Sequence, residues 1–408
     1  MKIASLQGPL ELGIDYRRFV PASKMDQASP PFFNPDHPHN IGDWYLTKIV
    51  DRLLDYDELL LVGKQAGARE WDIVNEQCDA LVLRGGNYIQ DLWFAKHVGL
   101  DTLRKVKIPI ILFGAGLQNP SGKRPVFDPA EREALRLIHD SCEFSALRGN
   151  STAEALAAIG IENTIVTGCP TIYWSREPRL ELRTPGAVNG GFTFRKSLYS
   201  ADTDLNRAEF DAIRIARTRF ENVTVFLQGE EVAMQRLLMA RKWHAEYSGR
   251  MQPVPGQHLH RLERRPLDAS ALRREVHDMF DAHADAELVD WVIENSFFSW
   301  DISEMIGRYR QMDFMFGCRL HGNLLALANG TPAFYLTYDE RTREIAELFE
   351  LPHCDLAHFG PEVDLMASDF APAKAAYAQR YEDMVRFLDA NRLDHRLQQA
   401  PALQPAAP

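Results

Sequence analysis

Short apolar runs alternate with amphipathic stretches along most of the chain. The runs have the length and composition of buried strands, and they cover residues 2–6, 59–62, 80–83, 108–113, 165–166, 191–194, 223–227, 314–316 and 333–336. Helical patterns lie between them. Asp128-Pro129 can open one helix, with the aspartate as its cap, and the capping box Ser151–Glu154 can open another, which Gly160 ends. This alternation predicts parallel sheets that are covered on both faces.

A polar segment that contains prolines, residues 175–187, divides the alternation in two. We therefore predict two doubly wound α/β domains in tandem, over residues 1–177 and 186–360. Residues 231–300 are long and charged, and they are expected to form a mostly helical elaboration of the second domain.

The C-terminal region, residues 361–408, predicts a helix and a tail. An apolar stripe at helical spacing lies between Ala371 and Asn391 and consists of Tyr377, Tyr381, Met384, Phe387 and Leu388. Residues 398–408 are rich in alanine and proline, so we expect them to be disordered.

Composition and charge exclude several classes of protein. The 408 residues are 45% hydrophobic and 25% charged, which is typical of a folded globular chain. The net charge of −11 and the lack of a basic tail argue against nucleic-acid binding. No apolar stretch is long enough to span a membrane and no signal peptide is evident, so we expect a cytoplasmic protein. The five cysteines form no CxxC pair, and no metal site is predicted.

The segment from Phe316 to Asn323 carries the most informative chemistry. A strand is expected to end at Gly317 and a helix to begin at Gly322, with Arg319 and His321 between them. Unpaired backbone N–H groups and the positive end of the helix dipole suit a phosphate or carboxylate, which an arginine can grip with two hydrogen bonds. An arginine and a histidine that neighbouring backbone satisfies would explain the segment as well.

Other arginines also follow predicted strands, at Arg148, Arg195 and Arg341. A single arginine at a strand end is usually a surface residue with a solvated head. Arg148 and Arg195 belong to different predicted domains, so they would form an anion site if they faced each other across the interdomain cleft.

Two further segments lie where ligands of parallel sheets bind. Asp43 precedes a helical pattern, and its spacing favours a helix cap over a base at the mouth of a cleft. Gly85-Gly86 and Gly114-x-Gly116 let backbone approach a ligand, but tight turns explain them as well. Neither matches the nucleotide-binding patterns GxGxxG or Walker A.

Taken in order, these segments resemble the polysaccharide pyruvyl transferase family. The resemblance runs from about Asn40 to Pro352, and its motifs are Asn40-x-Gly42-Asp43, Gly85-Gly86, Gly114-x-Gly116, Ser145-x-x-Arg148, Gly168-x-Pro170, Arg319-Leu320-His321-Gly322, Gly330-x-Pro332 and Tyr338-Asp339. It implies a glycosyltransferase-B-like fold with a cleft between two Rossmann-like domains. It also implies transfer of pyruvate from phosphoenolpyruvate onto two hydroxyls of a sugar, which forms a cyclic ketal and releases phosphate.

The resemblance also assigns roles to residues. Arg148, Arg319 and His321 would hold the donor, and Asp43, on the acceptor side in the first domain, would contact the sugar. We expect His321 to protonate the methylene carbon, because anions beside it would keep it charged, and Asp43 to accept the proton of the attacking hydroxyl. The other expected substrate contacts are Arg195, Arg341, Leu320, Gly322, Asn40, Gly42, Gly85 and Gly86. Phosphoenolpyruvate is a substrate here, and no cofactor is expected.

Three positions depart from the family pattern. Cys169 stands where the family often has aspartate, Arg341 where it commonly has lysine, and Asn87 where its glycine-rich turn has a third glycine. Arginine keeps the positive charge of lysine but presents it in a different geometry. The loss of aspartate at position 169 leaves one role unfilled or moved.

Two other functions stay open. A glycosyltransferase that uses a nucleotide sugar has the same architecture, and architecture does not fix function. It needs a carboxylate for the ribose hydroxyls, and the loose candidates are Glu230, Glu231 and Asp339. A catalytically silent relative that binds a glycan is the second alternative, and retention of the donor and acceptor residues counts against it.

The acceptor and its surroundings are the least defined part. A lipid-linked glycan, a position at the inner face of the membrane and a homo-oligomer are all compatible with the sequence. The basic residues of the elaboration could shape acceptor access or touch a membrane surface, but a solvated helical face is favoured; they are Arg261, Arg264, Arg265, Arg273 and Arg274.

Overall fold

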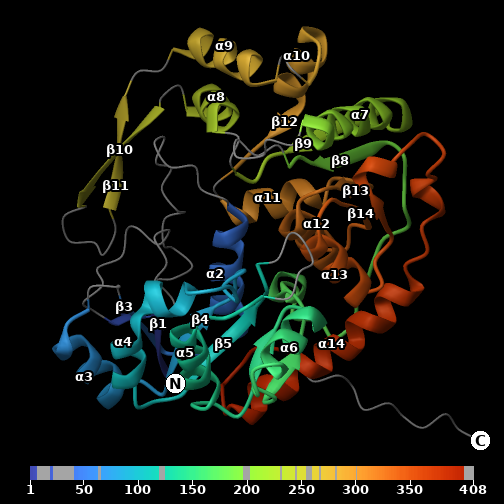
Figure 1. The fold of residues 1–408 in the computed structure, drawn as a ribbon. Coiled ribbons are helices and arrows are strands. Elements are labelled where there is room, and N and C mark those ends of the chain that lie inside the picture. Colours follow the sequence, from blue (N-terminus) through green and yellow to red (C-terminus); the bar gives the residue numbers. More distant parts are fainter. Residues whose placement is uncertain are drawn as a thin grey trace, which may run out of the picture.

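The computed structural model describes residues 1–6, 19–21, 41–62, 66–118, 125–195, 203–229, 232–243, 246–253, 260–265, 268–280, 283–299 and 301–398. Within these residues the chain forms two open sheets with helices packed against them (Figure 1). The predicted fold class, two Rossmann-like α/β units, is therefore confirmed. The exact domain boundaries stay a prediction.

The first sheet has the strand order β2-β3-β1-β4-β5-β6-β7. All its pairs are parallel except that of β2 with β3. The strands are β1 (Lys2–Leu6), β2 (Phe19–Pro21), β3 (Glu58–Val62), β4 (Ala80–Arg84), β5 (Ile110–Ala115), β6 (Ser145–Leu147) and β7 (Thr164–Val166). Neighbouring residues face opposite sides, so Ile3 packs in one core and Ala4 in the other. Both faces are therefore buried.

Helices connect these strands and cover the sheet. They are α2 (Ile41–Leu53), α3 (Ala68–Gln77), the π-helical turn η1 (Ala95–Gly99), α4 (Leu100–Lys105), α5 (Pro129–His139), α6 (Asn150–Ala157) and the 3₁₀ turn η2 (Pro170–Tyr173). The start of α5 is as predicted, because Asp128 accepts a hydrogen bond from the Ala130 N–H at 2.8 Å. The capping box at Ser151 is wrong: α6 begins at Asn150, and its cap position, Gly149, has no side chain to offer.

The second sheet is parallel throughout, in the order β12-β9-β8-β13-β14-β15. Its strands are β8 (Asn189–Thr193), β9 (Asn222–Phe226), β12 (Ser296–Phe297), β13 (Phe314–Gly317), β14 (Ala333–Thr337) and β15 (His353–Asp355). Its helices include α7 (Thr203–Arg219), α11 (Ile302–Tyr309), α12 (Leu320–Ala328) and α13 (Glu340–Leu348). Strand order reverses between β8 and β13, and ligands of such sheets bind beyond the carboxyl ends of strands at this point.

The expectation of a mostly helical elaboration over residues 231–300 is wrong in its middle. Helices α8 (Val232–Trp243), α9 (Ala269–Phe280) and α10 (Ala286–Asn295) are present, but β10 (Glu246–Pro253) and β11 (His260–Arg265) form an antiparallel pair. These strands are mostly polar, so their sequence lacks an alternating apolar signal. The basic residues are divided between β11 and α9 and do not share one helical face.

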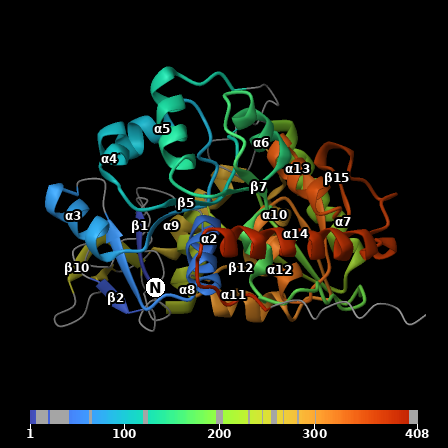
Figure 2. The ribbon, with the colours of Figure 1, turned by 90° about the horizontal axis from the view of Figure 1, so that it is seen from below.

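The C-terminal helix α14 (Ala371–Ala390) buries the whole predicted stripe. Although it follows the second sheet in sequence, it returns to the first: Arg380 Nη1 donates to the Val166 carbonyl at 3.0 Å, and Asn391 Nδ2 donates to the Phe144 carbonyl at 2.9 Å. Figure 2 shows α14 running from the second unit toward the first. The predicted disordered tail, apart from residue 398, lies outside the described residues. None of the described helices is long and apolar enough to cross a membrane.

Candidate functional site

Segments that follow the carboxyl ends of strands in the two sheets touch each other directly. Arg341, beyond β14, donates from Nη1 to Gln118 Oε1 of the first unit at 3.1 Å. Glu344, on α13, accepts a hydrogen bond from the Ser151 N–H at 2.6 Å, at the start of α6. Segments of the first unit near the predicted site residues therefore contact segments of the second unit.

Arg148, a predicted donor ligand, presents an unpartnered edge of its guanidinium. It follows β6, its exposed fraction is 5%, and its Nη1 donates to Asn87 Oδ1 at 2.8 Å. Its Nε and Nη2 are buried and have no hydrogen-bond partner. These two nitrogen atoms form the edge of the guanidinium that binds a carboxylate or phosphate with two hydrogen bonds. Because buried charged nitrogens without hydrogen-bond partners are costly, this edge is suited to an anionic ligand.

His321 supplies a second unpartnered polar atom, from the other unit. Helix α12 begins at Leu320, so His321 lies in its first turn and the predicted start at Gly322 is two residues late. Its Nε2 is buried without a hydrogen-bond partner. Burial, together with Arg148 and Arg319 nearby, lowers the pKa of His321 to about 3. The ligand-free protein therefore holds a neutral imidazole, and the expected acid role requires a bound anion to raise this pKa.

Arg319 holds the ends of the second sheet together. It is the residue before α12, and its Nε donates to the Phe194 carbonyl at 3.0 Å while Nη2 donates to the Gly229 carbonyl at 2.8 Å. Two backbone carbonyls thus occupy the edge that would grip an anion. The hydrogen bonds of Nε and Nη2 therefore agree with the alternative interpretation, in which neighbouring backbone carbonyls are the partners of Arg319. The positive charge of Arg319 still acts on His321.

Arg195 is buried with a counter-ion. Its Nε lies 3.9 Å from Oε2 of the fully buried Glu209, and its Nη2 donates to Asn206 Oδ1 at 3.1 Å. Its guanidinium carbon also lies 4.8 Å from the centre of the Tyr338 ring. The charge of Arg195 is therefore largely balanced inside the second unit.

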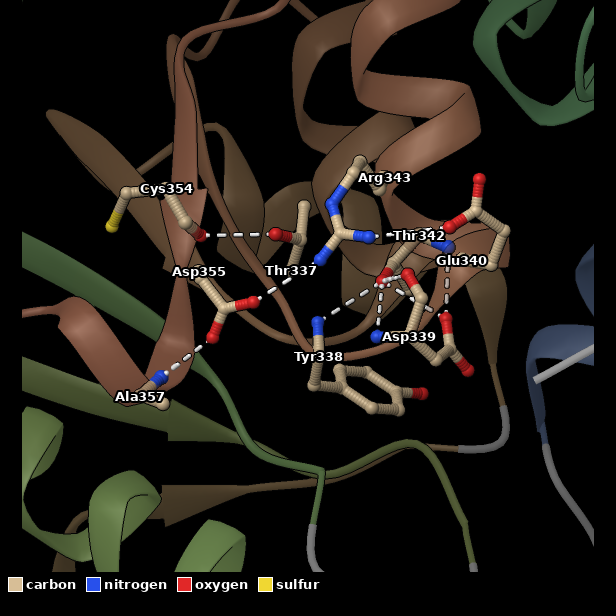
Figure 3. Close-up of polar contacts among 9 residues, drawn as sticks. All are labelled: Thr337, Tyr338, Asp339, Glu340, Thr342, Arg343, Cys354, Asp355 and Ala357. Carbon is tan, nitrogen blue, oxygen red and sulfur yellow. Dashed lines mark hydrogen bonds and ion pairs between the residues drawn. The ribbon is translucent and has the colours of Figure 1, made fainter. Parts of the chain in front are cut away.

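Arg341 is balanced too, by Asp339. Its Nε donates to Asp339 Oδ2 at 2.9 Å, and its Nη2 contacts the same oxygen. Asp339 Oδ1 accepts the Thr342 N–H at 2.9 Å and so caps α13 (Figure 3). Figure 3 also shows Arg343 between Glu340 and Asp355, so the polar residues beyond β14 are engaged with one another.

Tyr338 lies among the predicted site residues, although the sequence analysis named it only as part of a motif and gave it no role. Its ring packs on Arg195, and it stands beside the Asp339 cap in Figure 3. Burial raises the pKa of Tyr338 to about 12, and Arg319 and Arg341 oppose this rise, which places the phenol among three arginines. The available signal was its position directly after β14, in the Tyr338-Asp339 motif.

The acceptor-side residues are only partly described. Asn40 lies outside the described residues, and nothing is described of the Asp43 side chain. Since α2 begins at Ile41, Asp43 is inside the first turn and is not the N-cap that its spacing favoured. The Ile41 N–H donates to the Gln228 carbonyl at 2.6 Å, and a Cβ on Gly322 would overlap Gln228 Nε2. The starts of α2 and α12 therefore meet at Gln228.

Several predicted contact residues have structural explanations. A Cβ on Gly85 would overlap the Phe113 and Gly114 carbonyls, and one on Gly86 would overlap the Tyr88 ring. Leu320 is half-buried, and its carbonyl accepts a hydrogen bond from Tyr335 Oη at 3.1 Å. Gly42 is buried near the start of α2. A role of these residues in substrate binding stays a prediction.

Cys169, where the family often has aspartate, is fully buried in the core. Its Sγ contacts Thr171 Oγ1 at 3.6 Å, at the start of η2. Within the described ranges, no group of three or more histidine, cysteine, aspartate or glutamate residues is arranged to hold a metal ion.

Comparisons with known proteins place this geometry in context. A family model described as polysaccharide pyruvyl transferase matches residues 16–340. No curated protein sequence matches. Among solved structures, a UDP-GlcNAc 2-epimerase from Methanocaldococcus jannaschii, in complex with UDP-GlcNAc and UDP, is 11% identical at a TM-score of 0.43 over 95% of this chain and 99% of that one. MnaA of S. aureus, in a structure with UDP, is 11% identical, with a TM-score of 0.38 over 98% of this chain and 92% of that one. The glycosyltransferase SnogD from Streptomyces nogalater is 11% identical, with a TM-score of 0.34 over 95% of each chain.

Proposed function

The protein belongs to the polysaccharide pyruvyl transferase family, whose model matches residues 16–340, and on this premise we propose that it transfers pyruvate from phosphoenolpyruvate to a sugar. The acceptor is a sugar of a cell-surface polysaccharide or of its precursor, lipid-linked precursors included. Two of its hydroxyls form a cyclic ketal with C2 of pyruvate, and phosphate is released. No cofactor besides the donor substrate takes part.

One observation supports this proposal most strongly. Arg148 from the first unit and His321 from the second both keep buried polar atoms without partners, and the charge of Arg148 acts on His321. Phosphoenolpyruvate carries a phosphate and a carboxylate, and either group can accept two hydrogen bonds from the Nε and Nη2 edge of Arg148. The other anionic group then lies within the field of Arg319 and the start of α12.

Donor binding prepares His321 for proton transfer. The negative charge of the donor opposes the effects of burial and of the two arginines, so the pKa of His321 rises and the ring takes up a proton. His321 gives this proton to the methylene carbon, and C2 becomes cation-like. A sugar hydroxyl attacks C2 while Asp43 accepts its proton. General acid–base catalysis of this kind contributes about 10²- to 10⁴-fold in rate.

The second half of the reaction closes the ketal. Loss of phosphate from C2 regenerates a cation-like centre, which the second hydroxyl attacks. The two hydroxyl protons balance the proton added to the methylene carbon and the one that leaves on hydrogen phosphate. Orientation of the two hydroxyls against C2 supplies the remainder of the rate enhancement.

The glycosyltransferase alternative gains no specific support. Asp339, its one described candidate for the ribose hydroxyls, caps α13 and pairs with Arg341. The other two candidates, Glu230 and Glu231, lie outside the described residues.

The proposed function is tested by incubating the protein with phosphoenolpyruvate and a panel of sugars, and by measuring released phosphate and ketal formation together. We expect acceptor-dependent release of one phosphate per ketal. Thermal-shift measurements with phosphoenolpyruvate and with UDP-sugars accompany the assay. Stabilisation by a UDP-sugar and none by phosphoenolpyruvate would favour the glycosyltransferase, and binding of glycan without turnover would favour a silent relative.

A further inference from the structure

Asn87 meets Arg148 at the point where three turns of the first sheet converge. Asn87 follows β4, Gly116 follows β5 and Arg148 follows β6. Asn87 Oδ1 accepts the hydrogen bond from Arg148 Nη1 at 2.8 Å. A Cβ on Gly116 would lie 3.2 Å from Arg148 Cβ, from Arg148 Cδ and from Asn87 Oδ1. Gly116 thus leaves just enough room for both side chains.

The hydrogen-bond partner of Arg148 is neutral, in contrast to the carboxylates beside two other buried arginines, Arg84 and Arg195. Arg84 pairs with Asp51 at 2.9 Å, and Arg195 lies beside Glu209. Arg148 has an amide as its hydrogen-bond partner, and no described carboxylate lies within ion-pair distance of its guanidinium, although the charge of Glu344 acts on it from farther away. A carboxamide oxygen accepts a hydrogen bond without cancelling the charge of its donor. Asn87 thus holds Arg148 in place without adding to the negative charge that Glu344 already brings near it.

The geometry of the contact also selects which edge of Arg148 is presented. Asn87 accepts a hydrogen bond from Nη1 alone, and the opposite edge, which consists of Nε and Nη2, has no partner. A planar guanidinium that is fixed at one corner cannot rotate away from a ligand at the opposite edge without breaking that hydrogen bond. Fixing the group before the ligand arrives reduces the ordering that binding requires.

We propose that Asn87 is a positioning residue, which fixes Arg148 through a neutral hydrogen-bond acceptor and leaves its two-nitrogen edge open to the anionic donor. This inference rests on the proposed function for the identity of that anion. It also explains why a side chain with an amide is useful at a turn position where the resemblance leads one to expect glycine.

Asn87→Asp provides the sharpest test, because aspartate has the same shape, keeps the acceptor for Arg148 Nη1 and adds a negative charge. Asn87 Nδ2 forms no hydrogen bond in the described structure, so the exchange breaks none. We expect phosphoenolpyruvate and inorganic phosphate to bind about 10- to 100-fold more weakly by isothermal titration calorimetry, as the loss of a charge-assisted contact implies. Binding should also become less sensitive to NaCl, which a purely structural defect would not cause.

Two further variants complete the test. Asn87→Leu removes the hydrogen bond without adding charge, and we expect an affinity loss of roughly 3- to 10-fold, smaller than that of Asn87→Asp. Gln311→Glu is the matched control, because the exposed Gln311, which follows α11, accepts at Oε1 a hydrogen bond from Arg308 Nη1 at 2.8 Å. This control should bind both ligands as the parent does.

The outcomes separate the inference from the proposed function. If the parent protein binds neither phosphoenolpyruvate nor phosphate, the proposed function fails. If the parent binds phosphoenolpyruvate and Asn87→Asp binds it equally well with unchanged salt dependence, the positioning role of Asn87 is wrong and the function stands. Should Asn87→Asp fail to fold, an unchanged affinity in Asn87→Leu overturns the inference instead.

Discussion

Arg148 of the first unit and His321 of the second lie close enough for the guanidinium to help lower the pKa of the imidazole. Each also keeps a buried nitrogen without a partner. A protonated His321 is therefore electrostatically unfavourable beside these arginines, and a bound anion would relieve that condition. This coupling links donor binding to the protonation state of the catalytic candidate.

Donor binding should therefore be accompanied by proton uptake. Between pH 7 and 8, titration of phosphoenolpyruvate in buffers of different ionisation enthalpy should reveal up to about one proton taken up per site, because the pKa of His321 rises on binding. His321→Gln should bind the donor without this uptake. Equal proton uptake in the parent and the variant would show that another group titrates.

The protein should lose stability in weak acid. Burial lowers the pKa of His139 to about 4, and that of His321 is lowered to about 3, both below the value of about 6.5 in an unfolded chain. Stability is thus complete above about pH 6.5 and declines as the pH falls, by roughly 2 kcal/mol per histidine at pH 5. Melting temperatures at pH 7.5 and 5.0 measure this decline. His139→Leu should show a smaller decline than the parent, and an identical one would contradict the account.

The contact between Glu344 and the start of α6 should couple the two units. Burial raises the pKa of Glu344, while the Ser151 N–H favours its charged form. Glu344→Ala leaves that N–H without its partner and should lower stability by about 1–2 kcal/mol. Gly149→Ala should have a similar effect, because the added Cβ would overlap the Glu344 carboxylate.

Melting temperatures of the two single variants and of the Gly149→Ala/Glu344→Ala double variant test this coupling. Because the alanine at 149 meets no carboxylate once Glu344 is removed, the double variant should be no less stable than Glu344→Ala alone. Strictly additive losses would show that the two positions act independently.

Tyr338 should act on Arg195 through its ring. Tyr338→Phe keeps the ring over the guanidinium, whereas Tyr338→Leu removes it and should weaken donor binding about 3- to 10-fold, as expected for a buried cation–π contact. Calorimetric measurement of the donor affinity of both variants distinguishes the contribution of the ring from that of the hydroxyl. A loss in Tyr338→Phe as large as that in Tyr338→Leu would assign the effect to the hydroxyl.

Local patterns were sufficient to predict the two sheets and the buried stripe of α14, because strand and helix periodicities are set by which side chains are buried. They failed at β10 and β11, whose polar residues carry no periodic signal. They also failed at α6, where Ser151 is contacted by Glu344, 193 positions along the chain. A cap from a distant segment leaves no trace in local spacing.

In the candidate site, too, local sequence predicts some features while others depend on tertiary contacts. Arg148, Arg319 and His321 could be selected from their positions after strands, but their individual nitrogen atoms could not be assigned. That Arg319 donates to Phe194 and Gly229 while Arg148 keeps an open edge depends on tertiary contacts. Tyr338 was named only within the Tyr338-Asp339 motif, because its contact with Arg195 depends on tertiary structure.

The central claim is that phosphoenolpyruvate binds to the open edge of Arg148, and calorimetry with Arg148→Lys tests it most directly. Lysine keeps the charge but cannot form two parallel hydrogen bonds, so we expect donor affinity to fall at least about 10-fold. Arg104→Lys, at an exposed arginine on α4, should bind as the parent does. An Arg148→Lys variant that binds phosphoenolpyruvate as tightly as the parent would contradict the account.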